Sequence, residues 1–202
     1  MASILPTKSN LIAAKNSRDL AKTGFDLMDR KRNILARELM GLIDKAETLQ
    51  SQIGTVFNTA YDSLRMSNIA LGKSDRIAEA TVPDNGLTLR YRSVMGVELP
   101  SVIGEDKPLT LPYGFIDTGA VLDDAYIKFN RVKVLIRELS ETENTIYRLA
   151  YSIKKTQKRA NALKNVVIPD LDRTIRSIAD SLEEKEREDF VRLKVIKANS
   201  RE

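Results

Sequence analysis

An unbroken apolar stripe in the second half of the chain restricts its possible folds most strongly. From residue 132 to residue 167 the stripe alternates steps of 3 and 4 residues without a slip. Such a heptad repeat puts one narrow apolar face along a helix, and a second helix buries that face in a coiled coil. The stripe consists of Val132, Leu135, Leu139, Thr142, Ile146, Leu149, Ile153, Thr156, Ala160, Leu163 and Val167.

A stripe of the same kind lies in the first third of the chain. The stretch from Ser9 to Arg65 holds no proline and predicts one long helix. Leu20, Leu27 and Met28 are expected to extend the stripe more loosely toward the amino terminus. Its regular part consists of Leu35, Leu39, Leu42, Ala46, Leu49, Ile53, Val56 and Ala60.

Pro169 interrupts the second helix but not its apolar stripe. The stripe continues beyond the proline with a change of phase, at Leu171, Ile175, Ile178 and Leu182. One interpretation is a continuous helix, kinked near Pro169 at a cost of roughly 3 kcal/mol for the lost hydrogen bond and the ring clash. The alternative is two helices with a tight corner at Val167–Asp170.

The centre of the chain has a different character, with most of the prolines and glycines. A short helix is expected around Ser74–Ala80 and a turn at Asp84–Gly86. Two runs then alternate apolar and polar residues, which predicts a β-hairpin. We expect its apolar face to be covered, because a two-stranded unit alone is marginal. The alternating apolar residues are Leu87, Leu89 and Tyr91 in one run, and Met95, Val97 and Leu99 in the other.

Together these segments predict a mainly α fold. Two long helices form an antiparallel coiled coil, because the central segment can reverse the chain. The expected division is a helix in 1–65, an insertion with a short β-hairpin in 66–120, and a helix in 121–202. In this arrangement Leu42 is expected to lie near Ile178.

The composition argues against an enzyme with its own active site. The chain has no histidine and no cysteine, so the commonest general base and the thiolate ligands of metal sites are missing. No phosphate-binding glycine loop is present, and we expect no catalytic, cofactor or metal site. A basic cluster at residues 154–159 lacks interleaved aromatics, which disfavours nucleic acid. With no apolar run of membrane length and no signal peptide, we expect a cytoplasmic protein without direct membrane insertion.

Two distant blocks resemble the D subunit of the A/V-type rotary ATPases. The first is the start "PTKSNLIAAKNSRDLAKTGF", and the second is "RANALKNVVIPDLDRTI" with the finish "EKEREDFVRLKVIK". Lys164 departs from the family pattern, where a glutamate is common, and the centre matches only loosely through Tyr113-Gly114-Phe115. The matching positions in the second block are Asn161, Ala162, Leu163, Ile168, Pro169, Thr174, Ile175, Glu186, Arg187, Glu188, Arg192, Leu193, Lys194, Ile196 and Lys197.

The resemblance implies a non-catalytic rotor shaft in the central stalk of a proton- or sodium-translocating complex. Such a shaft couples ATP synthesis or hydrolysis to ion transport, at the cytoplasmic face of the membrane. Its implied partners are the catalytic A and B subunits, the F subunit and a membrane-ring adaptor subunit. The alternative function is a static coiled-coil scaffold or tether.

Both ends of the chain are expected to touch partners, because an antiparallel pair brings them to the same end. A frayed end without a role is the alternative. The candidate contact residues are Leu5, Lys8, Leu11, Lys15, Arg192, Leu193, Lys194, Ile196 and Lys197.

Overall fold

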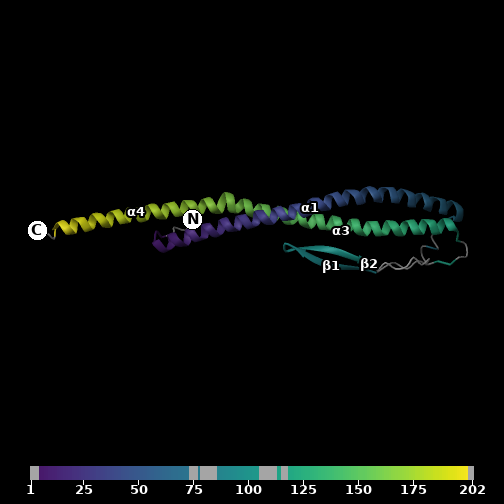
Figure 1. Cartoon of the computed structure of the whole chain (residues 1–202), viewed down its shortest axis with the longest axis horizontal. Helices are drawn as coiled ribbons and strands as arrows, with labels where there is room; N and C mark the ends of the chain where they lie inside the picture. The colour runs from purple at the N-terminus through teal and green to yellow at the C-terminus, as the bar shows by residue number, and fades with distance from the viewer. Residues whose placement is uncertain (1–4, 73–76, 78–85, 105–112, 115–117, 200–202) are drawn as a thin grey trace. The chain divides into compact units, whose positions relative to one another are not determined.

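The computed structural model describes residues 5–72, 77, 86–104, 113–114 and 118–199. It confirms a mainly α chain, with long helices before and after a β-hairpin (Figure 1). The short helix expected around residues 74–80 and the turn expected at residues 84–86 fall almost wholly outside the described residues. The elements are α1 (Lys8–Leu71), β1 (Leu87–Val94), β2 (Val97–Gly104), α3 (Ala120–Ala162), a π-helical turn (Leu163–Val167) and α4 (Ile168–Asn199).

The chain forms two compact units. The first joins Met1–Ile34 with Ile153–Glu202, and the second is Leu35–Ser152. Helix α1 and helix α3 each contribute to both units. The division of the chain into 1–65, 66–120 and 121–202 stays a prediction.

Within the first unit the helices run antiparallel. Lys8 Nζ lies 2.9 Å from Glu186 Oε1, and Arg18 Nη1 lies 3.8 Å from Asp172 Oδ1. The partner's number falls as the number in α1 rises, as antiparallel pairing requires. Ile178 therefore lies opposite the first turns of α1, and its expected pairing with Leu42 is wrong.

Within the second unit α1 and α3 are also antiparallel. Ser63 Oγ donates a hydrogen bond to Asp124 Oδ2 at 2.9 Å, and Tyr61 meets Phe129 edge to face at 5.5 Å between ring centroids. All eight predicted stripe positions of α1 between residues 35 and 60 are buried or half-buried, so this stripe is confirmed. It continues at the same steps through the buried serines Ser63 and Ser67, which the prediction left out because they are polar.

The amino-terminal part of the stripe differs from the expectation. Leu20 and Leu27 are 74% and 60% exposed, so they do not belong to it. The covered face includes two arginines, whose long stems pack while their charged heads find polar partners. The covered positions, all buried or half-buried, are Leu11, Ala14, Arg18, Ala21, Phe25, Met28 and Arg32.

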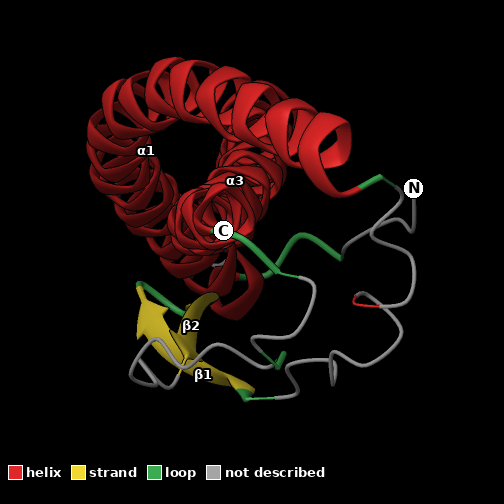
Figure 2. Cartoon of the chain, turned by 90° about the vertical axis from the view of Figure 1, so that its right-hand side faces the viewer, coloured by secondary structure: helices red, strands yellow, loops and turns green. Residues whose placement is uncertain are grey.

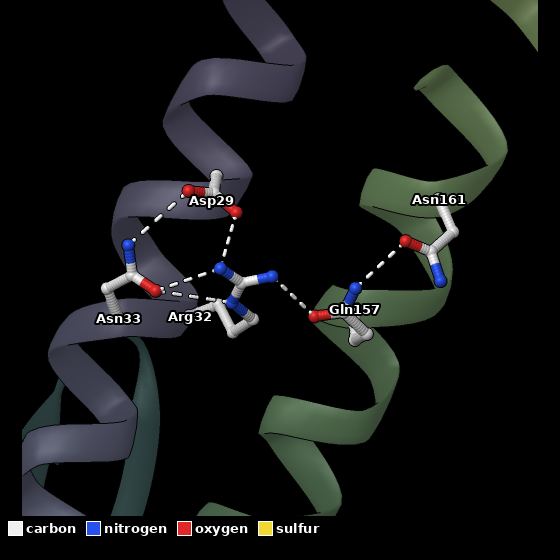
Figure 3. Close-up of polar contacts among 5 residues, drawn as sticks. All are labelled: Asp29, Arg32, Asn33, Gln157 and Asn161. Atoms are coloured by element: carbon white, nitrogen blue, oxygen red, sulfur yellow. Dashed lines mark hydrogen bonds and ion pairs between the residues drawn. The ribbon is translucent and has the colours of Figure 1, made fainter. Parts of the chain in front are cut away.

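Arg32 lies at one of these covered positions, and a network of polar contacts holds its guanidinium group (Figure 3). Its Nη1 donates to Gln157 Oε1 of α3 at 2.8 Å, and its Nη2 lies 2.7 Å from Asp29 Oδ1. Arg32 also donates to Asn33 Oδ1, while Gln157 donates to Asn161 Oδ1 at 2.8 Å. A polar group at a stripe position favours one register over shifted alternatives, since a shift would leave it without its partners.

Pro169 lies just after a π-helical turn rather than at a break. The N–H of Ile168 bonds to the carbonyl of Leu163, five residues earlier, and helical structure continues to Asn199. This confirms the interpretation as one continuous helix and contradicts the alternative of a tight corner at Val167–Asp170. The turn adds one residue, so Ile168 is half-buried where Val167 was expected, and Val167 is 39% exposed. The phase change in the sequence is therefore the inserted residue of a π-bulge.

Replacing Pro169 with alanine is expected to keep the helix content and raise the midpoint of thermal unfolding by a few degrees. Alanine restores a backbone donor, and it removes a residue that costs up to about 3 kcal/mol inside a helix. Since the π turn already relieves part of that cost, we expect a gain of about 1 kcal/mol, or roughly 2–4 °C. Circular dichroism checks both quantities. A loss of helix content would mean that the proline is required for the local backbone path.

The hairpin is antiparallel, with Leu87 opposite Gly104 and Val94 opposite Val97. Its two-residue turn is Met95-Gly96, with φ of 50° and 74°. Positive φ at both central positions matches the twist of a tight hairpin. Met95 was expected in the second strand, but it lies in this turn. The two predicted antiparallel strands are otherwise confirmed.

The hairpin contacts α3 through β2, as Figure 2 shows with β2 on the helix side. Val102 N–H donates to Glu141 Oε2 at 2.8 Å, and Arg148 Nη1 donates to the Glu98 carbonyl at 3.0 Å. Val97 and Leu99 of β2 are buried, at 9% and 1% exposure. The outer edge of β2 therefore bonds to α3, and β2 is the strand that anchors the hairpin to this helix.

The apolar face of β1 is not covered as expected. Leu87, Leu89 and Tyr91 are 53%, 60% and 56% exposed. The register puts these three side chains on the opposite face of the hairpin from the buried Val97 and Leu99. The described bonds to α3 come from β2.

Candidate interaction surfaces

The last turns of α4 form the most exposed part of the described chain. Every residue from Glu183 to Asn199 is exposed, whereas Ile175 and Ile178 just before them are buried. The bridge between Lys8 and Glu186 involves the first residue of α1. Residues 187–199 therefore extend past the start of α1 by about 20 Å, at 1.5 Å per residue.

This projecting segment, residues 187–199, is called the α4 tip below. It holds five large apolar side chains that are more than half exposed. Contiguous exposed apolar surface marks interaction sites in soluble proteins, so the α4 tip is a candidate interaction surface. The five are Phe190, Val191, Leu193, Val195 and Ile196.

The charges on the α4 tip are partly paired along the helix itself. Arg187 bonds to Glu183, and Arg192 lies 3.8 Å from Glu188 and 3.9 Å from Asp189. Exposed pairs of this kind contribute about 0–1 kcal/mol each, so a partner can exchange them at little cost.

The predicted contact residues fall into two sets within the first unit. Lys8, Leu11 and Lys15 lie in the first turns of α1 and Leu5 lies just before it. Leu5 is 72% exposed and Leu11 is half-buried. The other five, Arg192, Leu193, Lys194, Ile196 and Lys197, lie on the α4 tip and are exposed. Lys8 is the one in the first set with a described ion pair to α4. The structure thus puts both sets at one end of the unit without merging them into one patch.

The second unit carries a polar cluster that sequence analysis did not identify. Lys128 Nζ lies 2.6 Å from Asp124 Oδ2 and donates to Ser63 Oγ at 2.6 Å. Hydrogen bonds from Lys128 and Ser63 lower the pKa of the Asp124 carboxyl, and the charge of Lys128 adds to this effect. A lowered pKa means that the contribution to stability is present above the ordinary pKa and is lost as the pH falls through the shifted one.

Two signals in the sequence could have indicated this cluster. Ser63 and Ser67 continue the α1 stripe at steps of 3 and 4 from Ala60, and Asp124 and Lys128 are spaced for a helical ion pair. The cluster lies in an open groove with a volume of about 580 Å³, and its other lining residues are Thr59, Asp62, Met66, Ala120 and Val121.

Tyr113, from the loosely matching Tyr-Gly-Phe step, contacts the start of α3. Its hydroxyl donates to Asp123 Oδ1 at 2.7 Å, and its ring meets Tyr126 edge to face. Burial, together with the hydrogen bond to the Asp123 carboxylate, raises the pKa of Tyr113. Phe115 lies outside the described residues.

Lys164, the departure from the family pattern, has a contact of its own. Its Nζ lies 5.8 Å from the centroid of the Phe25 ring in α1. A cation over an aromatic face contributes about 0.5–1 kcal/mol at an exposed site. A lysine is therefore accommodated here.

A metal-binding cluster and a membrane-spanning helix are both absent among the described residues. They hold no group of three or more histidine, cysteine, aspartate or glutamate side chains arranged to bind a metal ion. Within the same ranges, no helix is both long and apolar enough to cross a membrane.

Comparison with known proteins gives consistent results over nearly the whole chain. Residues 10–198 match the family of the ATP synthase D subunit. The chain is 43% identical to the D subunit of a V-type ATP synthase from Thermotoga neapolitana, with 96% of this chain and 97% of the relative covered. It is 34% identical to the D subunit of an A-type ATP synthase from Methanopyrus kandleri, covering 95% and 84%. The corresponding protein of Pyrococcus furiosus is also 34% identical, covering 96% and 94%.

Proposed function

The chain belongs to the ATP synthase D subunit family, and from this premise we propose that it is the rotor shaft in the central stalk of an A/V-type ATPase or ATP synthase. It couples ATP synthesis or hydrolysis in the catalytic ring to the transport of protons or sodium ions. ATP chemistry takes place on other subunits, and this chain contributes contacts rather than catalytic groups.

The observation that carries this proposal is the exposure of the α4 tip. Five large apolar side chains that stay exposed to solvent do not stabilise a helix end. They contribute hydrophobic free energy only when a partner buries them. A surrounding ring of subunits is such a partner. As the shaft turns, the ring subunits meet different sides of the tip in succession, and each favours the conformation that contacts the side it faces.

The proposed partners follow the length of the chain. The α4 tip and the start of α1 contact the ring of catalytic A and B subunits. The F subunit binds alongside the helices, and a membrane-ring adaptor subunit meets the other end of the shaft. The chain is thereby held at the cytoplasmic face of the membrane without inserting into it.

Single-molecule rotation tests the proposal. The sequence has no cysteine, so Tyr147→Cys gives one label on an exposed position of α3, where the tyrosine is 73% exposed. In a complex of this chain with A and B subunits on a surface, a bead on this cysteine is expected to turn in one direction when ATP is added.

A bead that stays fixed while the complex hydrolyses ATP would overturn the proposal in favour of a static tether. The control is the same complex without ATP, in which the bead is expected to show no net rotation.

A further inference from the structure

The hairpin has one anchored edge and one open edge. Val102 N–H and the Glu98 carbonyl both reach α3 side chains, so they point away from β1. Their cross-strand partners are Leu89 and Ser93. In an antiparallel pair, residues opposite such outward-pointing positions are themselves outward-pointing. The N–H and C=O groups of Leu89 and Ser93 therefore point away from β2.

The same alternation applies to the whole length of β1. Leu87, Leu89, Tyr91 and Ser93 present outward backbone groups, while Thr88, Arg90, Arg92 and Val94 bond to β2. The described part of the chain adds no third strand to this sheet and gives these outward groups no hydrogen-bond partner. All residues of β1 but the last are exposed. The strand is thus an eight-residue open edge.

The side chains of this edge are sorted by face. Leu87, Leu89 and Tyr91 lie on one face, and Arg90 and Arg92 lie on the other. Arg148 adds a third positive charge, 5.4 Å from the Tyr91 ring centroid. Glu98 is the one acidic residue of the two strands, and it lies on β2 rather than on the open edge.

We propose that the outer edge of β1 binds an extended acidic segment of a protein partner, which adds to the hairpin as a third strand. The partner's apolar side chains lie beside Leu89 and Tyr91, and its carboxylates lie beside Arg90 and Arg92. Backbone hydrogen bonds supply the affinity in this mode of binding, and alternate side chains supply the specificity. Cross-strand pairs of opposite charge add to both.

A second copy of this chain fits the edge poorly. Symmetric antiparallel pairing of two β1 strands about Tyr91 would place Arg90 of each copy opposite Arg92 of the other. Like charges directly opposite one another are destabilising. The two arginines thus oppose self-pairing in this register, as charged residues on edge strands do, and they remain compatible with an acidic strand.

The test uses the full chain and two fluorescent eight-residue peptides, one alternating valine with glutamate and the other alternating valine with lysine. Fluorescence anisotropy is expected to show binding of the glutamate peptide that is tighter by about tenfold or more, as several charge pairs together give. Arg90→Glu with Arg92→Glu is expected to reverse this preference. Arg65→Glu with Arg131→Glu changes the net charge equally at exposed helical positions of the same unit and is expected to keep the preference.

Two further variants separate backbone pairing from charge alone. Leu89→Pro removes one outward N–H without removing a bond to β2, and it is expected to weaken binding of the glutamate peptide by about tenfold. Leu89→Ser keeps the N–H and is expected to weaken it less. Equal effects of the two variants in folded protein would contradict strand addition.

Hydrogen exchange of the unchanged protein gives an answer even if Leu89→Pro fails to fold. The glutamate peptide is expected to slow exchange at the amides of Leu89, Tyr91 and Ser93. Binding without that slowing overturns the proposal, as does equal binding of both peptides. Self-association through β1 in sedimentation, with no peptide binding, would overturn it by assigning the edge to a second copy. The inference does not rest on the proposed function, and the isolated chain tests it separately from rotation.

Discussion

Ending the chain at Glu186 is expected to leave its folding almost unchanged and to abolish most of the coupling between ATP hydrolysis and ion transport. The removed residues include the α4 tip, whose described positions are all exposed, so few packing interactions are lost and the unfolding midpoint should move by less than about 2 °C. Coupling is expected to fall by about tenfold or more, because the truncation removes the apolar surface proposed to face the catalytic ring. ATP-driven ion uptake into vesicles that contain the whole complex measures it.

The matched control removes exposed apolar surface elsewhere. Tyr147 and Tyr151 on α3 are 73% and 63% exposed, and changing both to serine should leave coupling near the level of the unchanged protein. Unchanged coupling in the truncated complex would show that the α4 tip is a frayed end without a role. A truncated chain that fails to join the complex would contradict the expectation that folding and assembly survive.

Changing Leu35 to alanine is expected to cost about 2–5 kcal/mol of unfolding free energy, whereas the same change at Leu27 should cost less than about 0.5 kcal/mol. Leu35 is 0% exposed and Leu27 is 60% exposed, and both lie in α1. Alanine and leucine are both good helix formers, so the comparison isolates burial from helix propensity.

Thermal unfolding followed by circular dichroism measures the difference. For a chain of this length, the expected loss at Leu35 corresponds to roughly 5–15 °C in the unfolding midpoint. Similar losses at both positions would return Leu27 to the buried stripe, where the sequence pattern had placed it, and would contradict the described packing of α1.

The sequence pattern predicted the long helices and their apolar faces well. A step of 3 or 4 residues is a direct consequence of helix geometry, so the buried positions from Leu35 to Ala60 could be identified one by one. The same reasoning detected the phase change near Pro169. It did not identify the π turn, because an inserted residue shows itself in backbone hydrogen bonds, and Val167 was assigned to the stripe in place of Ile168.

The candidate contact surface could be predicted only in part. The sequence of a long helix does not distinguish an apolar residue that another helix covers from one that is exposed. Phe190 and Ile196 are exposed because no described helix accompanies α4 beyond Glu186, and the stripe pattern alone could not locate that point. Arg18 and Arg32 were missed for the opposite reason, since charged residues at covered positions do not appear in an apolar pattern.

The order of residues alone is enough to say which segments are helical, which turn back as a hairpin and which side of each helix is apolar. The register of the helices depends instead on three-dimensional contacts such as Arg18 with Asp172 and Arg32 with Gln157. The physical reason is that a heptad repeat shifted by seven residues presents nearly the same apolar face, so the repeat allows several registers and specific polar pairs select one. Which strand is anchored is likewise settled by packing, because alternation marks two faces of a hairpin and leaves open which edge meets a helix.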